Sequence, residues 1–241
     1  MSQNFSELAL DVSEIAKNLI TEDGQPVDNT FSAKQMRLLV EPLYSSWTPA
    51  LSEDAPEDAP RKFYADADVG VFNSVFEPPI VPDMFLSLDV EFRPDWEMKE
   101  HRAYFVWEFG KVPDVSVEIV SNTKGGEISQ KRNRYERLRI TYYVVFDPFL
   151  ALGGQKLRVF ELGFGNRYRL REDFLLPEVG LSLTLWKGEF EARNEEWLRW
   201  CDAEGNLILT GAERAQLAES RAEKAEAEIE RLKAELLGLQ K

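Results

Sequence analysis

Two apolar stretches, residues 83–90 and 114–121, constrain the fold most, because each combines a strand pattern with a carboxylate. In both stretches apolar side chains occupy every second position, which predicts β-strands with one buried face. Asp83 opens the first stretch directly after a proline, and Glu118 lies on the opposite face from the apolar residues of the second. Two carboxylates on neighbouring strands can converge on one divalent cation, and hard oxygen ligands suit Mg²⁺ or Mn²⁺.

A predicted helix supplies a third charged residue. Residues 127–139 have helical periodicity, with Ile128, Tyr135 and Leu138 on one face and Lys131 in the middle of that face. A lysine at the centre of an apolar stripe can orient an attacking water or stabilise charge that develops on a phosphate. The combination of Asp83, Glu118 and Lys131 therefore predicts a metal-dependent phosphodiesterase site.

Several segments carry a resemblance to a known family. The segments are Val-Pro-Asp at 81–83, Val-Glu-Ile-Val-Ser-Asn at 117–122, Lys-Gly-Gly-Glu at 124–127, Lys131, Tyr135, Tyr-Tyr-Val-Val-Phe-Asp-Pro at 142–148, Leu-Arg-Val-Phe-Glu-Leu at 157–162, Leu-Ser-Leu-Thr-Leu-Trp-Lys-Gly at 181–188 and Trp-Leu-Arg-Trp at 197–200. Together they resemble the Uma-type family of putative bacterial restriction endonucleases, members of the PD-(D/E)XK nuclease superfamily. The similarity covers roughly residues 30–240.

The resemblance implies an α/β (α+β) fold, in which helices flank a restriction-endonuclease-like mixed sheet core. It also implies a DNA endonuclease in which Asp83 and Glu118 bind Mg²⁺ or Mn²⁺. One departure matters, because the superfamily's lysine usually follows the acid by two residues, and Val120 occupies that position. The resemblance therefore assigns the lysine role to Lys131 on the following helix.

A structural explanation exists for each of these residues taken singly. Asp83 can be a turn residue, Glu118 can pair with an arginine, and Lys131 can extend past Tyr135 to solvent. The alternative function is a catalytically inactive, nuclease-like binding or assembly module, because Val120 replaces the usual lysine. Fold resemblance alone does not decide between the two classes.

Charge restricts how such a protein can bind DNA. The net charge is −14, whereas a protein that holds DNA usually presents a basic face. The acidity is uneven: residues 51–60 form an acidic stretch, whereas 124–139 contain six basic residues (Lys124, Lys131, Arg132, Arg134, Arg137 and Arg139) against two glutamates. We expect DNA binding to be weak and salt-sensitive, and a solvated helix exterior is an equally good explanation of the basic strip.

The rare residues narrow the chemistry. His101 is the only histidine and Cys201 the only cysteine, which argues against a histidine-based metal cluster, a Ser-His-Asp triad and an intramolecular disulfide. We expect His101 at the surface and Cys201 in packing. No run approaches the roughly 20 apolar residues of a membrane helix, and no signal-peptide pattern is present, so we expect a cytoplasmic protein without a membrane partner.

The chain divides into three predicted parts: a polar, mobile N-terminus (1–28), a PD-(D/E)XK nuclease-like domain (29–209) and a charged heptad helix (210–241). Within the domain, Ser32 and Gln35 resemble a capping box that opens a helix through about Leu43. Glu41 on that helix is a possible acid of the site, although a surface role fits it better.

Further strands complete the predicted sheet. Residues 63–73 and 140–147 have strand patterns, and Asp66 and Asp68 in the first of these are minor site candidates, with Asp68 expected near Asp83. Shorter strands in 157–185 predict a β extension of the sheet. A hairpin follows through residues 202–209.

The C-terminal segment keeps a strict heptad. Thr210 and Glu213 form a capping-box pattern. The apolar positions that follow are Ala215, Ala218, Ala222, Ala225, Ile229, Leu232, Leu236 and Leu239. Charged residues flank this seam, as in a coiled coil, and we expect a homodimer through residues 225–240. A solitary charged helix with many i,i+4 pairs is the alternative.

Overall fold

The computed structural model describes residues 29–50, 61–91, 101–121 and 127–239. The predicted mobile N-terminus (1–28) lies outside the described residues. The acidic stretch 51–60 and Lys124 lie outside them too.

A six-stranded mixed sheet in the order β1-β3-β5-β6-β7-β8 forms the centre of the fold. Its strands are β1 (Phe63–Asp66), β3 (Met84–Leu88), β5 (Val115–Ile119), β6 (Tyr142–Phe146), β7 (Leu157–Gly163) and β8 (Arg167–Leu170). Strands β5 and β6 are parallel, and the other neighbouring pairs are antiparallel. Parallel neighbours require a crossover, and here the chain crosses one face of the sheet as η3 (Glu127–Lys131) and α4 (Arg132–Leu138).

Two smaller sheets and the remaining helices complete the described fold. The elements are α2 (Thr30–Ser46), β2 (Val71–Phe72), β4 (Tyr104–Phe105), α3 (Val106–Phe109), β9 (Leu175–Leu176), η4 (Pro177–Val179), β10 (Leu181–Phe190), β11 (Arg193–Asp202) and α5 (Gly211–Leu239). Strands β2 and β4 pair in parallel, whereas β9, β10 and β11 form a separate antiparallel sheet. The predicted β extension is therefore correct for β7 and β8 and wrong for the strands that follow. Those strands turn away and pack on the central sheet, because their apolar faces bury more surface there.

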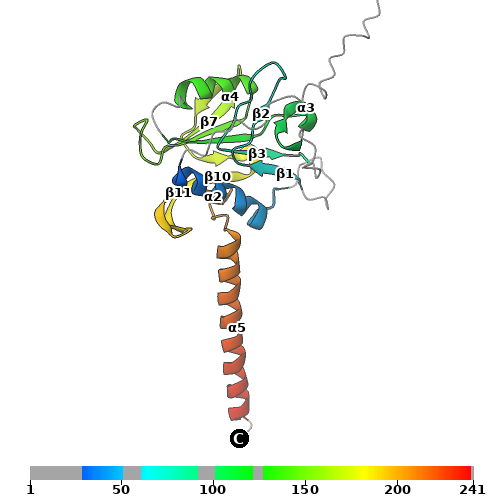
Figure 1. The fold of residues 1–241 in the computed structure, drawn as a ribbon. Helices are drawn as coiled ribbons and strands as arrows, with labels where there is room; N and C mark the ends of the chain where they lie inside the picture. Colours follow the sequence, from blue (N-terminus) through cyan, green and yellow to red (C-terminus); the bar gives the residue numbers. More distant parts are fainter. Residues whose placement is uncertain (1–28, 51–60, 92–100, 122–126, 240–241) are drawn as a thin grey trace, which may run out of the picture.

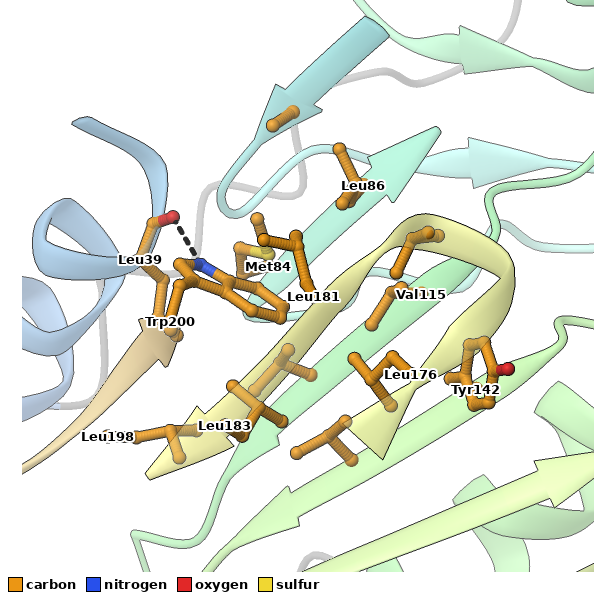
Figure 2. Close-up of a cluster of buried hydrophobic side chains, with 14 of the residues drawn as sticks. Leu39, Met84, Leu86, Val115, Tyr142, Leu176, Leu181, Leu183, Leu198 and Trp200 are labelled. Atoms are coloured by element: carbon orange, nitrogen blue, oxygen red, sulfur yellow. Dashed lines mark hydrogen bonds between the residues drawn. The ribbon is translucent and has the colours of Figure 1, made fainter. Parts of the chain in front are cut away.

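One face of the central sheet is covered by α2 and the sheet of β9 to β11. The buried residues between them are almost all aliphatic, and Figure 2 shows this core around Trp200 of β11. The Trp200 indole Nε1–H donates to the Leu39 carbonyl of α2 at 2.8 Å, which satisfies the one polar atom of that ring. This interface fixes the helix, the hairpin and the central sheet relative to one another.

The opposite face of the central sheet is covered by α4 (Figure 1). The buried cluster on this side contains aromatic and aliphatic residues, including Tyr135 of α4 and Tyr143 of β6, whose rings stack 4.6 Å apart. This face carries Glu118, which is 1% exposed. The mixed sheet flanked by helices is consistent with the predicted restriction-endonuclease-like fold.

The first helix begins differently from the predicted capping box. Asn29 is the N-cap, and its side chain accepts a hydrogen bond from the Ser32 backbone at 2.9 Å. Gln35 is fully buried and exchanges two hydrogen bonds with the backbone of Leu198 in β11, at 2.8 and 2.9 Å. The capping-box prediction was therefore wrong, because Gln35 joins α2 to the hairpin sheet.

The C-terminal helix α5 extends away from the body on the side opposite α4 (Figure 1). Its predicted capping box is confirmed, since the Thr210 and Glu213 side chains each accept from the other's backbone N–H, at 2.8 and 3.1 Å. Arg199 is 1% exposed and donates to both carboxylate oxygens of Glu213, at 2.6 and 2.7 Å. The Gly211 N–H donates to Glu41 at 2.8 Å. These contacts anchor the base of α5, and the helix then continues for about 43 Å at 1.5 Å per residue.

Candidate active site

Asp83 directly precedes β3, and Glu118 lies in the neighbouring strand β5. The antiparallel register pairs Met84 with Val117, and one further residue places Asp83 opposite Glu118 on the same face of the sheet. Directly opposed residues in such a pair have Cβ atoms about 4.5–5.5 Å apart. The backbone N–H of Ile119 donates to Asp83 Oδ2 at 2.5 Å, which ties the loop residue to β5. The two strands therefore bring both carboxylates to the carboxyl end of β5.

Lys131 contacts Glu118 from the helix that covers this face of the sheet. Its Nζ lies 2.7 Å from Glu118 Oε2, and the Tyr135 hydroxyl donates to Glu118 Oε1 at 2.5 Å. Lys131 is the last residue of the π-helical turn, and Tyr135 follows four residues later on the same helical face. The Lys131 side chain is 35% exposed, so its ammonium group reaches solvent while its partner carboxylate is buried. Lysine, carboxylates and tyrosine thus form one cluster.

The electrostatics of Tyr135 also reflect this arrangement. Burial raises the pKa of Tyr135 well above its ordinary value, and the negative charge of Glu118 acts in the same direction. The charge of Asp83 contributes to the same rise in the pKa of Tyr135. The phenol therefore stays protonated near neutral pH, and it donates to Glu118 without competing for a proton.

The carboxylate pair suits a divalent cation with few protein ligands. Among the residues that the structure describes, no group of three or more His, Cys, Asp or Glu side chains could hold a metal ion. Mg²⁺ is commonly bound through one or two carboxylates, with waters and substrate phosphates in the remaining positions. Asp83 and Glu118 together fit that pattern.

The minor candidates occupy different positions. The Asp66 carboxylate accepts from the Ala67 N–H at 2.8 Å, and burial raises its pKa. The Asp68 backbone N–H donates to the Asp83 carbonyl at 3.3 Å, so Asp68 lies beside Asp83 as expected. Glu41 caps α5, which agrees with a surface role. Cys201 is buried, as predicted, whereas His101 is half-buried rather than fully exposed.

Tyr135 is the residue of this cluster that the sequence did not single out for chemistry. It was predicted as part of an apolar stripe and of the family resemblance, without a chemical role, and its ring is fully buried. The available indication was its spacing of four residues from Lys131, which places both side chains over the same strand position. A tyrosine in an apolar stripe also needs a hydrogen-bond partner for its hydroxyl, and Glu118 supplies it.

The exterior of α4 is basic, as the sequence indicated. Arg134 and Arg137 are exposed, whereas Arg132 lies over the Phe160 ring at 5.6 Å. Glu136 is buried instead of solvated, and it accepts from the Tyr168 N–H at 2.8 Å and from Arg167 at 3.1 Å. The exposed surface of the helix is therefore more basic than its sequence suggests.

A mixed sheet flanked by helices, with two acids and a lysine at one strand end, corresponds to the class of restriction-endonuclease-like proteins. The chain belongs to the Uma2 family, described as putative restriction endonuclease, whose family model matches residues 41–191. The family assignment points to nuclease activity and to DNA as a substrate. No curated protein matches the sequence significantly. None of the described helices is both long enough and apolar enough to cross a membrane.

Proposed function

We propose that this protein is a metal-dependent DNA endonuclease that hydrolyses phosphodiester bonds. Its active site consists of Asp83, Glu118 and Lys131. The observation that carries the proposal is the contact between Lys131 and the buried Glu118, directly across the strand pair from Asp83. A buried carboxylate is costly unless it is paired, so a cluster of this kind is most often retained for a function. Membership of the family supports the same reaction class.

Asp83 and Glu118 are the residues that would hold Mg²⁺ or Mn²⁺. A bound divalent cation supplies Lewis acidity toward a phosphoryl oxygen and lowers the pKa of a bound water. The protein's part is orientation: Ile119 positions the Asp83 carboxylate, and Tyr135 fixes the Glu118 carboxylate through its hydroxyl. Both contacts hold the acids in place before substrate arrives, which reduces the cost of assembling the site.

Lys131 contributes the positive charge that Val120 does not supply. Its partly exposed ammonium group can contact a phosphate or a water at the mouth of the site while it keeps its ion pair with Glu118. In this position it orients the attacking water and stabilises negative charge that develops on the phosphate. The helix-borne lysine thus takes the role that the superfamily usually gives to the second residue after the acid.

DNA binding by this protein is proposed to be weak and salt-sensitive. The net charge of −14 opposes approach to a polyanion, and α4 offers the basic strip beside the site. Affinity that depends on a few arginine–phosphate contacts falls steeply as salt rises. We also keep the cytoplasmic location and the division at residues 28 and 209 as predictions from the sequence.

The endonuclease proposal is tested with supercoiled plasmid in Mg²⁺ or Mn²⁺, with EDTA as the metal-free arm. Asp83→Asn should lower the nicking rate at least about 100-fold, because it removes a ligand charge at the reacting centre. Asp89→Asn is the matched control. Asp89 is an exposed aspartate that directly follows β3 and pairs with Arg61. Nicking that survives Asp83→Asn or persists in EDTA would refute the proposed site.

The exposed C-terminal helix favours a second candidate, an assembly role through a homodimer. Ile229 and Leu232 are 50% and 46% exposed, which is unusual for large apolar side chains on a charged helix. They fall on the heptad seam proposed for residues 225–240, where a second copy would cover them. The same seam would serve an inactive binding module as well as a dimeric nuclease.

Light scattering tests the dimer with Ile229→Lys combined with Leu232→Lys. These substitutions leave the anchor between Arg199 and Glu213 intact, so the body of the protein is unaffected. We expect the wild-type mass to be twice that of the double variant. Lys233→Gln serves as a control on the charged flank of the helix. An unchanged mass in the double variant would remove the dimer from the proposal.

A further inference from the structure

A polar groove of about 630 Å³ adjoins the cluster around Lys131 on the same helix. It lies between α4 and the loop that joins β2 to β3. Its polar and charged lining consists of Asn73, Ser74, Glu77, Arg134 and Arg137. The proposed catalytic residues are not part of this lining, so the groove needs an explanation of its own.

The two arginines of the groove differ from those arginines of this acidic chain that pair with carboxylates. Arg37, Arg61, Arg171 and Arg199 each form a salt bridge with a carboxylate. Within the described residues, Arg134 contacts backbone carbonyls only, chiefly that of Pro79 at 3.0 Å. Arg137 reaches the Asn133 carbonyl at 3.4 Å, and the same part of the structure provides it with no carboxylate. Their charges therefore remain available for an anionic group, and guanidinium suits a phosphate.

An exposed aromatic ring stands on the loop that forms the other wall. Val71 and Ile80 exchange two backbone hydrogen bonds, at 2.7 and 3.1 Å, which close the loop at its base. Phe76 near its tip is 76% exposed, and its neighbours Ser74 and Glu77 line the groove. An exposed phenyl ring on a loop that lines a groove with two arginines provides the two kinds of contact that bind nucleic-acid single strands, base stacking and phosphate contacts.

The groove also lies in line with the candidate site. Lys131, at the end of η3, is followed at intervals of three residues by Arg134 and Arg137 on the exposed side of α4. Six residues of helix rise about 9 Å, so these positive charges are spread along the length of the helix. A strand whose phosphate reaches Lys131 can therefore continue along the helix to the two arginines of the groove.

We propose that this groove binds an unpaired DNA strand next to the scissile phosphodiester, with phosphates on Arg134 and Arg137 and a base stacked on Phe76. The proposal rests on the proposed endonuclease function and narrows its substrate to DNA with single-stranded character. A base inside a duplex presents only its edge, so a stacking ring selects bases that are free of a partner strand. Glu77 opposes phosphate in the same groove and limits the affinity.

Fluorescence anisotropy with a labelled 20-nucleotide strand and the matching blunt duplex, both in EDTA, tests the groove without cleavage. We expect the wild type to bind the single strand more tightly than the duplex. Phe76→Ala should weaken single-strand binding about 5- to 100-fold, whereas Phe76→Trp should retain it because the larger ring still stacks. Phe164→Ala is the matched control, since Phe164 is 95% exposed and lies outside the groove.

The charges are tested by the salt dependence of the same titration. Arg137→Gln should lower the slope of log affinity against log salt by about 0.7 on a single strand, the value for one lost phosphate contact. Glu77→Gln should strengthen binding, because it removes a repelling carboxylate. Arg193→Gln, a change at an exposed arginine of the β10–β11 hairpin, should alter neither quantity.

The outcomes separate this inference from the proposed activity. Equal affinity for strand and duplex, or a Phe76→Ala protein that binds like Phe164→Ala, would overturn the groove even if plasmid nicking depends on Asp83. Conversely, a protein that fails to nick DNA but binds the single strand through Phe76 would refute the nuclease and support the groove. Because Phe76 is mostly exposed, circular dichroism should show the variants folded as the wild type is.

Discussion

The two faces of the central sheet differ in what they bury. The face toward α2 and the hairpin sheet buries aliphatic residues and Trp200, and its polar atoms are satisfied within the protein. The face toward α4 buries Glu118, Ser87 and Ser116 among aromatic rings. Alternate residues of the same strands supply the two faces, because strand side chains point to opposite sides. One strand thus contributes Val117 to the apolar core and Glu118 to the candidate site.

This difference between the two faces predicts which substitutions lower the stability of the fold and which lower its activity. Apolar burial stabilises a fold in proportion to the area removed from water, whereas a buried carboxylate costs free energy that its partners must offset. We therefore expect substitutions on the apolar face to lower stability and to spare the reaction of the molecules that remain folded. Substitutions on the α4 face should lower activity more than stability.

The largest effect on stability is expected for Trp200→Ala. Trp200 is 1% exposed and packs between α2 and the central sheet, so its loss leaves a large cavity and removes the hydrogen bond to the Leu39 carbonyl. The free energy of unfolding should fall by about 3–5 kcal/mol, as measured by urea denaturation. Phe164→Ala, at an exposed phenylalanine, should change it by less than about 0.5 kcal/mol. A Trp200→Ala protein as stable as the control would contradict the assignment of the main core to this face.

A smaller effect is expected for Tyr135→Phe, which removes one hydroxyl from the α4 face. The buried Glu118 then loses a donor to its charged form, and the free energy of unfolding should fall by about 1.5–3 kcal/mol. The nicking rate should fall as well, since the carboxylate is no longer fixed. Tyr168→Phe is the matched control, because that hydroxyl donates to the neutral Ile140 carbonyl at 2.7 Å. Equal nicking rates in the two variants would count against a positioning role for Tyr135.

The smallest effect on the free energy of unfolding is expected for Glu191→Gln, at the tip of the β10–β11 hairpin that contacts α2. Hydrogen bonds from Arg37 and Lys34 lower the pKa of Glu191 from 4.5 to about 2. A lowered pKa means that the ion pair stabilises the fold above about pH 4.5 and that this contribution disappears as the pH falls toward 2. The pair is partly exposed, so its contribution should stay below about 1 kcal/mol.

Urea denaturation of wild type and Glu191→Gln at pH 7 and pH 3 measures this contribution. The difference between the two proteins should be larger at pH 7, where the carboxylate is charged in both the folded and the unfolded chain. Added salt should reduce the difference at pH 7, because the groups are screened at the surface. A difference of the same size at both pH values would assign the effect to packing.

Local patterns predicted two central strands and their faces, whereas the single strand predicted for 63–73 is divided into β1 and β2 of different sheets. The alternation in 83–90 and 114–121 predicted β3 and β5, and the capping box at Thr210 predicted the start of α5. The approach of Lys131 to Glu118 followed from a charged residue on an apolar helical stripe and from the resemblance. These predictions succeeded because each depends on residues close together in the sequence.

The features that sequence patterns missed include long-range contacts and one local turn. Gln35 has the spacing of a capping box, yet its amide pairs with Leu198, which is 163 residues away. The β10–β11 hairpin turns at Glu191 and Ala192, both with positive φ, where neither residue type signals such a turn. The burial of Glu136 required knowledge that β8 returns beside α4. Tertiary packing decided the long-range contacts, and no local pattern encodes it.

The central claim is that Lys131 serves the reaction at Asp83 and Glu118, and the nicking rate of Lys131→Met tests it most directly. The assay uses supercoiled plasmid and Mn²⁺, with Arg132→Met as the control on the next residue of the same helix and near-UV circular dichroism to establish folding. We predict that Lys131→Met lowers the rate at least about 100-fold in protein that is still folded, whereas Arg132→Met retains it. A folded Lys131→Met protein that nicks as fast as the control would contradict the account.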